Sequence, residues 1–259
     1  MFLGGTKHFG YYDRGDNAWN FPAALRKMEA FLGQQLNVPE GSTGLDAGCG
    51  VGDVARYLAT HFGLKVTGID LLDFNVDQAK LRSQRDQLKD KVCFDVMDYS
   101  ELTFPDETFD FVYTLETLVH SDNPETVLEG FFRVLRPGGR LVMIEYSKDP
   151  DTAIPSRVLD MLHFVNQVAA MPAFNRFDHG VLVDLVRKRG FSDVATLDIT
   201  DRMLPMVRCF AIVGALPYAV ARTLGKEAKV INAMSGVEFW RHRRYWQHNV
   251  VTATKPLAS

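Results

Sequence analysis

The sequence predicts an α/β protein built on a doubly wound, mostly parallel β-sheet with helical cap insertions. Three observations carry this prediction. Short apolar runs alternate with stretches of helical periodicity through the first two thirds of the chain, which is typical of parallel βαβ units. A glycine-rich turn, LDAGCGVG, follows the first of these runs. After Tyr146 the alternation gives way to longer apolar segments, which we expect to cover one edge of the sheet.

The composition indicates one globular domain spanning residues 1–259. Of these residues 46% are hydrophobic and 24% are charged, and the net charge is −3. This balance gives no general reason to expect a nucleic-acid partner, because phosphate binding needs clustered cations. Three scattered cysteines are too few for a disulfide framework or a zinc site, so we expect reduced thiols, a cytoplasmic protein and no metal. The opening MFLGGTKHFG lacks the pattern of a secretory signal.

Seven segments are predicted to be β-strands. The first five are apolar runs bounded by turn residues, as expected for strands buried on both faces. Two more follow after Tyr146, where the alternation of strands and helices ends: one after a helical segment and one near the end of the chain. The predicted strands are Thr43–Asp46, Lys65–Asp70, Val92–Asp95, Phe109–Thr114, Arg140–Tyr146, Val194–Ile199 and Asn249–Thr254.

Helices are predicted between these strands, where apolar residues recur at helical spacing. We expect the helix around Asn123–Arg136 to stop at Pro137–Gly139, because proline removes a donor and glycine admits a left-handed turn. The predicted helices are Asp53–His61, Asn75–Lys89, Asn123–Leu135 and Gly180–Arg189.

Two segments, about 147–179 and 201–247, are predicted to cap the carboxyl edge of a core at about 40–146. The second contains CFAIVGALPYAVA, an uncharged run over Cys209–Ala221. It is shorter than the ~20 residues of a membrane-spanning helix and contains Pro217, so we predict a buried helix or a lid and no stable membrane insertion. The Met and Phe side chains of both caps suit an apolar guest, and they suit packing on the core equally well.

The glycine-rich turn places an acid and three glycines at alternate positions, Asp46, Gly48, Gly50 and Gly52. A dinucleotide site would prefer a glycine where Asp53 stands, and a tight turn without any ligand is the simpler alternative. The pattern D-x-G-x-G-x-G resembles the first motif of class I S-adenosylmethionine-dependent methyltransferases. The resemblance implies S-adenosylmethionine as cofactor and S-adenosylhomocysteine as product. It places the glycine backbone beside the amino-acid part of the cofactor. It places Asp46 near the cofactor's ammonium group or in support of the loop.

Further motifs of the same family follow in order. The resemblance implies that Asp70, at the end of KVTGID, accepts hydrogen bonds from the ribose hydroxyls, with Leu71 beside it. A carboxylate suits a diol, although an aspartate that caps the next turn is the alternative. Asp98 would accept from the adenine amino group, with Met97 and Tyr99 beside the ring.

Two later segments, FPDETFDFVYTLETLVH and LRPGGRLVMIEY, resemble the fourth strand with its loop and a later turn and strand of the family. The first of them places Leu115 at the cofactor. Together the motifs imply the seven-stranded, Rossmann-like methyltransferase fold.

The opening KHFGYYDRG resembles that of sterol and tocopherol C-methyltransferases and related small-molecule enzymes. Tyr11 and Tyr12 would then close over the cofactor, since a tyrosine face attracts a sulfonium as it attracts other cations. Alternatively, these rings fasten the N-terminal segment to the core. The chain reads IEYSKDP where the sterol enzymes have an aromatic–Glu–Pro–Trp pattern, so a sterol is not the expected substrate.

The loop LETLVHS supplies the candidate catalytic residues, Glu116 and His120, four positions apart. His120 is suited to act as a general base near neutral pH. Glu116 would orient it, stabilise a cationic intermediate or contact the cofactor. A histidine with only a structural hydrogen bond is the alternative for His120.

These features predict methyl transfer from S-adenosylmethionine to the carbon, oxygen or nitrogen of a small lipophilic or aromatic metabolite, as in secondary metabolism. One alternative is a related protein that binds the cofactor without methyl transfer, either for regulation or to promote a cyclisation or rearrangement. An oxidoreductase is least favoured. The expected partner is a small molecule, and FWRHRRYWQHN is interpreted as a solvated helix before the last strand rather than a nucleic-acid site. A homo-oligomer is left open.

Overall fold

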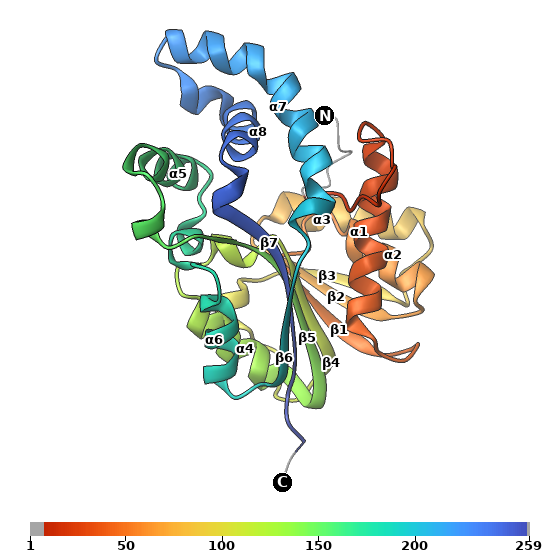
Figure 1. The fold of residues 1–259 in the computed structure, drawn as a ribbon. Helices are drawn as coiled ribbons and strands as arrows, with labels where there is room; N and C mark the ends of the chain where they lie inside the picture. The colour runs from red at the N-terminus through yellow and green to blue at the C-terminus, as the bar shows by residue number, and fades with distance from the viewer. Residues whose placement is uncertain (1–7, 258–259) are drawn as a thin grey trace.

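The computed structural model describes residues 8–257. Residues 1–7 lie outside them, and with them most of MFLGGTKHFG, in which no secretory signal is expected, and Lys7 of the N-terminal motif. The described chain forms a seven-stranded sheet in the order β3-β2-β1-β4-β5-β7-β6 (Figure 1). Strands β1 to β5 run parallel, and β7 is antiparallel to both β5 and β6. The predicted fold class is confirmed. The strands are β1 Thr43–Ala47, β2 Lys65–Asp70, β3 Val92–Val96, β4 Phe109–Leu115, β5 Leu135–Lys148, β6 Ser192–Asp198 and β7 Trp246–Thr254.

Helices cover both faces of the sheet. Figure 1 shows α1, α2 and α3 on one side and α4 and α6 on the other. A third group, α5, α7 and α8, stands beyond the carboxyl end of β5. The helices are α1 Phe21–Leu36, α2 Asp53–His61, α3 Asp73–Arg85, α4 Pro124–Val134, α5 Ser156–Val168, α6 Val181–Arg189, α7 Thr200–Thr223 and α8 Ile231–Arg241.

The central strands are buried on both faces. Val142 and Ile144 of β5 join the core beneath α1 and α2, whereas Leu141 and Met143 join the core beneath α4 and α6. Successive side chains of a strand point to opposite faces, so a strand between two helical layers must be apolar at every position. This explains why the sequence shows continuous apolar runs here.

Three of the four predicted helices differ from their predicted limits, α6 only in that it begins at Val181 rather than Gly180. The helix α4 begins after Asn123, whose side chain accepts from the amide of Thr126 at 3.2 Å, and it ends at Val134. It does not continue to Pro137–Gly139, because Leu135 already pairs with Phe109 as the first residue of β5. The proline and glycines instead form an irregularity within β5, where the register with β4 shifts.

The helix α3 covers Asp73–Arg85 rather than Asn75–Lys89. It ends where Gln87 adopts a positive φ of 57°. The helix α1 has no predicted counterpart, although its start carries a capping signal. The Asn20 side chain accepts from the amide of Ala23, and a proline occupies the first turn.

The apolar run of the second cap is longer than predicted. It lies in α7, a single helix of 24 residues that continues through both Pro205 and Pro217. Close packing on α8 stabilises it, because Gly214 faces the backbone of Ala233 and Gly236 faces Phe210 without room for a Cβ atom. Within the described residues, α7 is the one helix long and apolar enough to cross a membrane, and 39% of its most apolar window is buried.

Candidate active site

The glycine loop after β1 has three glycines with positive φ, 97° at Gly48, 52° at Gly50 and 75° at Gly52. A Cβ atom at Gly48 would lie 2.6 Å from the side chain of Thr117, and one at Gly52 would lie 2.6 Å from the ring of Phe94. These two glycines allow close packing. A Cβ atom at Gly50 would meet nothing within 4 Å, so the backbone there borders open space that a ligand can approach.

Asp70 connects this loop to the end of β2. One carboxylate oxygen accepts from the amide of Gly50 at 2.9 Å. The other accepts from the amide of Leu72 at 2.9 Å and from the side chain of Asn75 at 3.0 Å. Asp70 therefore fixes the loop and the start of α3, and its half-buried carboxylate keeps further lone pairs.

Asp46 lies behind the loop and is only 3% exposed. Its Oδ2 atom has no hydrogen-bond partner among the described residues. Burial raises the pKa of Asp46 to about 7; the hydroxyl of Tyr113 opposes this rise, and the negative charge of Asp70 adds to it. A buried carboxylate oxygen without a partner suits a cationic ligand group, which would restore its ionised form.

The predicted adenine residues follow β3. Asp98 is exposed and accepts from the amide of Ser100 at 2.7 Å. The amide of Met97 donates to the carbonyl of Asp70 at 3.1 Å, and the Tyr99 hydroxyl donates to the carbonyl of Thr117 at 3.0 Å. The structure thus brings the ends of β1, β2 and β3 together with the loop after β4. Of the two leucines predicted here, Leu71 is exposed and Leu115 is buried.

The two tyrosines of the N-terminal motif pack on helices. The hydroxyl of Tyr12 donates to the carbonyl of Ala18 at 3.0 Å, and its backbone amide donates to the carbonyl of Arg202 at 2.8 Å. Tyr11 stacks on Phe31 at a ring distance of 4.7 Å. These contacts match the alternative in which the rings fasten the segment to the core. Contact between Tyr12 and the cofactor stays a prediction.

Glu116 and His120 do not form the expected pair. Glu116 has a positive φ of 59°, so the chain turns there and the two residues do not share a helix face. His120 is exposed, and its Nδ1 atom lies 2.6 Å from the carbonyl oxygen of Ala170. The expectation that Glu116 orients His120 is wrong, because a cap carbonyl holds the imidazole instead.

Glu116 instead lies in a buried network of residues distant in sequence. Its Oε1 atom accepts from the amide of Phe9 at 2.9 Å and lies 3.4 Å from Nε2 of His248. Its Oε2 atom accepts from the hydroxyl of Tyr146. The rings of Tyr146 and His248 stack with centroids 4.9 Å apart, because the two residues are paired across β5 and β7.

Burial sets the protonation of this network. It raises the pKa of Glu116 to about 7, although the Tyr146 hydroxyl and the Phe9 amide favour the ionised form. It lowers the pKa of His248 to about 3, and the charge of His8 adds to this effect. The imidazole of His248 is therefore neutral at physiological pH. Neither of its ring nitrogens has a hydrogen-bond partner in the described part of the chain, and the side chain is fully buried.

Local sequence patterns contain no direct signal for this network. Tyr146 ends a predicted strand, and His248 precedes the predicted start of another. Only the register of the antiparallel pair β5–β7 places them together, and local periodicity does not encode that register.

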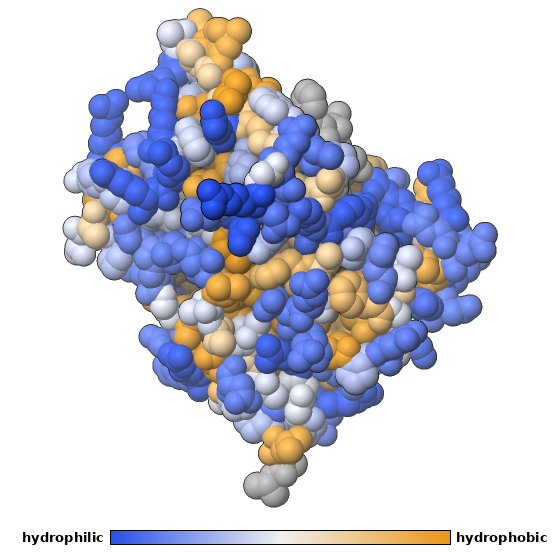
Figure 2. Space-filling model, turned by 45° about the vertical axis from the view of Figure 1, so that its right-hand side comes forward, coloured by the Kyte–Doolittle hydropathy of each residue, from blue (hydrophilic) through white to orange (hydrophobic). Residues whose placement is uncertain are grey.

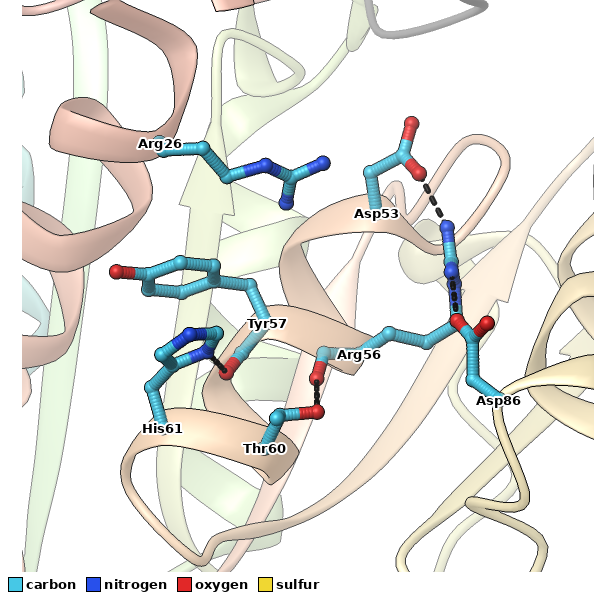
Figure 3. Close-up of a pocket in the computed structure, with 7 residues that line it drawn as sticks. All are labelled: Arg26, Asp53, Arg56, Tyr57, Thr60, His61 and Asp86. Atoms are coloured by element: carbon cyan, nitrogen blue, oxygen red, sulfur yellow. Dashed lines mark hydrogen bonds and ion pairs between the residues drawn. The ribbon is translucent and has the colours of Figure 1, made fainter. Parts of the chain in front are cut away.

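A surface pocket of about 360 Å³ lies elsewhere, on the outer side of α2 (Figure 3). Figure 3 shows Arg56 between Asp53 and Asp86, with which it forms ion pairs. These charged groups are engaged with one another, and the pocket contains none of the predicted site residues. Its lining residues are Arg26, Asp53, Arg56, Tyr57, Thr60, His61 and Asp86.

Comparison with known proteins places this geometry in a family. Residues 45–143 match the model of the methyltransferase domain. The S-adenosyl-L-methionine-dependent Diels-Alderase iccD of Talaromyces variabilis is 39% identical over 264 residues, which cover 99% of this chain and 89% of that protein. The O-methyltransferase rstn1 of Aspergillus nomiae is 31% identical over 199 residues, which cover 77% of this chain and 86% of that protein.

Solved structures share the fold. The [4+2]-cyclase SpnF superposes with a TM-score of 0.77 at 22% identity, covering 98% of this chain and 88% of that one. A geranyl diphosphate methyltransferase in complex with geranyl diphosphate and sinefungin superposes with a TM-score of 0.73 at 20% identity, covering 96% and 89%. Neighbours of this fold therefore bind small molecules. From its motifs, its sheet and these relatives, the chain belongs to the class I S-adenosylmethionine-dependent methyltransferase family, and it is an enzyme whose cofactor is S-adenosylmethionine.

Proposed function

We propose that this enzyme uses its cofactor to promote the cyclisation of a small lipophilic metabolite, a [4+2] cycloaddition, without moving the methyl group. One observation carries the proposal. The similarity to the Diels-Alderase of Talaromyces variabilis extends over 99% of the chain at 39% identity and thus includes α5, α7 and α8. The O-methyltransferase matches 77% of the chain at lower identity. Since we expect these helices to form the substrate surface, similarity throughout them favours a shared type of reaction.

The residues at the ends of β1, β2 and β3 fit the cofactor. The open space at Gly50 and the unpartnered Oδ2 atom of Asp46 suit an amino-acid group with its ammonium. The carboxylate of Asp70 suits a ribose diol. When bound, S-adenosylmethionine supplies a sulfonium whose positive charge polarises a nearby carbonyl. The residues proposed to hold it are Tyr12, Asp46, Gly48, Gly50, Gly52, Asp70, Leu71, Met97, Asp98, Tyr99 and Leu115.

The network around Glu116 is proposed to hold the polar end of the substrate. The neutral imidazole of His248, whose Nε2 atom lies 3.4 Å from Oε1 of Glu116, carries one N–H that is proposed to donate to a carbonyl oxygen from a water-excluded site. Hydrogen bonds to a carbonyl withdraw electrons from a conjugated alkene, and such donors are strongest where water is excluded. In the cycloaddition two carbon–carbon bonds form as two π bonds are lost. No proton leaves, so positioning can supply most of the acceleration.

Aromatic side chains surround this polar group. Tyr146 contacts Phe9 and Phe174 edge to face, with centroids 6.4 and 6.1 Å apart. Phe9 also contacts Phe210 of α7 at 5.9 Å. A polar centre within an apolar wall suits a lipophilic substrate with one carbonyl group.

We further propose that the enzyme is cytoplasmic, since Cys49, Cys93 and Cys209 form no disulfide. We also propose that its partner is a small molecule rather than a nucleic acid.

Methyl transfer to carbon, oxygen or nitrogen is the second candidate. The match to the methyltransferase domain over 45–143 and the complete glycine motif favour it. A phenol or enol would need a base, and Glu116, with its pKa of about 7, is better placed than His120. The sequence offers His120 as a base or as a structural histidine, and in the structure its side chain is exposed with Nδ1 2.6 Å from the carbonyl oxygen of Ala170.

Product mass distinguishes the two reactions. The probe is an acyclic polyene with a conjugated diene and a carbonyl-activated alkene, incubated with the enzyme and followed by chromatography with mass detection. Cycloaddition gives an isomer of the same mass, whereas methyl transfer gives a product heavier by one CH₂. We expect the isomer with S-adenosylmethionine and not with S-adenosylhomocysteine, which lacks the sulfonium charge. Isomer formation at equal rates with and without cofactor would overturn the proposal.

His248→Phe tests the network directly. Phenylalanine retains the stacking on Tyr146 but removes both ring nitrogens. We expect turnover to fall by about tenfold or more, as for the loss of one oriented donor. The free energy of unfolding should change by less than about 1 kcal/mol, because the nitrogens have no hydrogen-bond partners to lose. Unchanged turnover would exclude His248 from the reaction.

A further inference from the structure

One face of α7 is apolar and exposed to solvent. Ile212, Leu216, Val220 and Leu224 follow one another at intervals of four residues, and Val213 lies beside them. Their exposed fractions are 56% for Ile212, 54% for Val213, 74% for Leu216, 51% for Val220 and 61% for Leu224. Residues four apart share one face of a helix, so these five form a continuous apolar stripe. Figure 2 shows hydrophobic side chains at the top of the molecule, where Figure 1 shows α7 extending furthest from the sheet.

Cations border the stripe. Arg208 and Arg222 are exposed and stand fourteen residues apart, about four helical turns, so both lie on the same side of α7. Lys226 follows in the next loop. No aspartate or glutamate occurs between Asp201 and Glu227. The helix segment that carries the stripe therefore has cations and no acidic residue of its own, and the next acid in the sequence is Glu227.

The charges argue against a second copy of this chain as the occupant of the stripe. Two α7 helices packed through this face would bring arginine near arginine in either orientation, and this part of the chain has no acid to separate them. Like charges at an interface oppose association. Anionic lipid headgroups, in contrast, complement such cations, and an amphipathic helix with a basic border is typical of membrane-surface binding.

The dimensions fit a helix that lies on a bilayer rather than one that crosses it. The stripe from Ile212 to Leu224 is about 18 Å long at 1.5 Å per residue, whereas the hydrocarbon core of a bilayer is ~30 Å thick. The opposite face of α7 is buried, with Gly214 against Ala233 of α8 and Tyr218 only 6% exposed. That face is not free to contact lipid.

We propose that α7 docks this enzyme onto the surface of an anionic lipid bilayer, with the stripe in the headgroup region and Arg208 and Arg222 on the lipid phosphates. This inference does not depend on the reaction that the enzyme catalyses. A site beside the bilayer receives a lipophilic substrate from the membrane, where such a molecule concentrates.

Vesicle sedimentation tests the proposal with the full-length protein. We expect it to sediment with vesicles of phosphatidylcholine and about one-third phosphatidylserine, and to be released as the salt concentration rises. Leu216→Glu with Val220→Glu should lower the fraction bound by about tenfold or more, because each apolar side chain contributes to partitioning. Circular dichroism checks that the variant is folded, and its exposed positions make loss of the fold unexpected.

Leu197→Glu is the matched control, since Leu197 is 50% exposed on β6 and lies outside the stripe. It should bind vesicles like the unmodified protein. Failure of the unmodified protein to bind anionic vesicles would overturn the proposal, as would equal loss of binding in Leu197→Glu. Self-association in sedimentation equilibrium that Leu216→Glu abolishes, without vesicle binding, would assign the stripe to a second copy and equally overturn it.

Discussion

Glu116 holds its proton more tightly in the folded protein than in the unfolded chain. Burial is the main cause, and it raises the pKa from 4.5 to about 7 against the opposing hydrogen bonds of Tyr146 and Phe9. Because the pKa is raised on folding, the group contributes full stability below about pH 4.5 and loses it as the pH rises to about 7. At neutral and higher pH the ionised side chain therefore lowers the stability of the folded protein.

Glu116→Gln should remove this pH dependence. Glutamine retains the shape but cannot ionise. We expect the unmodified protein to lose up to about 3 kcal/mol of unfolding free energy between about pH 4.5 and 8 through this group, at about 1.4 kcal/mol per pKa unit, and the variant to lose correspondingly less. Urea unfolding at several pH values measures the difference. Parallel curves for the two proteins would contradict the prediction. Burial also raises the pKa values of Asp46 and Glu145 to about 7. These two groups contribute equally to the pH dependence of the unmodified protein and of the variant.

Lys148 is one of the residues that fix the first cap segment to the core. It is 1% exposed at the end of β5, and its ammonium group donates at 2.5 Å to both Asp151 and Asp178. Asp151 precedes α5, and Asp178 follows the short helix Pro172–Arg176. Lys148 thus holds both ends of the segment that contains α5.

Lys148→Met should loosen α5 without unfolding the core. Methionine fills the buried volume but leaves two partly exposed carboxylates without their cation. We expect about 1–2 kcal/mol of local destabilisation, less than for a fully buried pair. Hydrogen exchange of α5 amides should quicken by about tenfold for each 1.4 kcal/mol, while α2 amides stay unchanged. Equal acceleration in both helices would indicate general unfolding and contradict the prediction.

Gly214 determines how closely α7 and α8 approach. Gly214→Val should lower the unfolding free energy by about 1–3 kcal/mol through overpacking, because its Cβ atom would lie 2.8 Å from the carbonyl oxygen of Ala233. Ala215→Val is the control at the next, exposed position and should change it by about 0.5 kcal/mol or less. Thermal unfolding distinguishes them. A Gly214→Val protein as stable as the control would show that the helices can separate.

Prediction from sequence succeeded where the signal is local. Lys65–Asp70 was predicted with both limits correct, because turn residues flank an apolar run. The helix α1 has no predicted counterpart, although Met28, Leu32 and Leu36, all fully buried, recur at the spacing of four that indicates a helix. The continuation of α7 through Pro217 was not predictable locally, since packing on α8 offsets the missing hydrogen bond. For the same reason, His248 could not be assigned to Glu116 without the strand order.

At the scale of the whole molecule, cofactor binding should raise the melting temperature. A ligand at 100 times its Kd stabilises the folded state by about 2.7 kcal/mol, which corresponds to a rise of several degrees for a domain of this size. We expect this rise with S-adenosylmethionine and none with NAD. Asp70→Ala should abolish most of it, because the variant loses the acceptor for the ribose and the contact with Gly50. Differential scanning fluorimetry measures the shift, and a full shift in Asp70→Ala would remove that residue from the site.

The strand order also bears on how the chain folds as it leaves the ribosome. In the sheet, β7 lies between β5 and β6, although it is the last strand of the described chain to be synthesised. Until it emerges, β6 has no strand to pair with, β5 presents an open edge, and Glu116 lacks its neighbour His248. Strand insertion between distant segments is slow and leaves apolar edges unprotected meanwhile. Production of this enzyme should therefore depend on chaperone supply more than its final stability suggests.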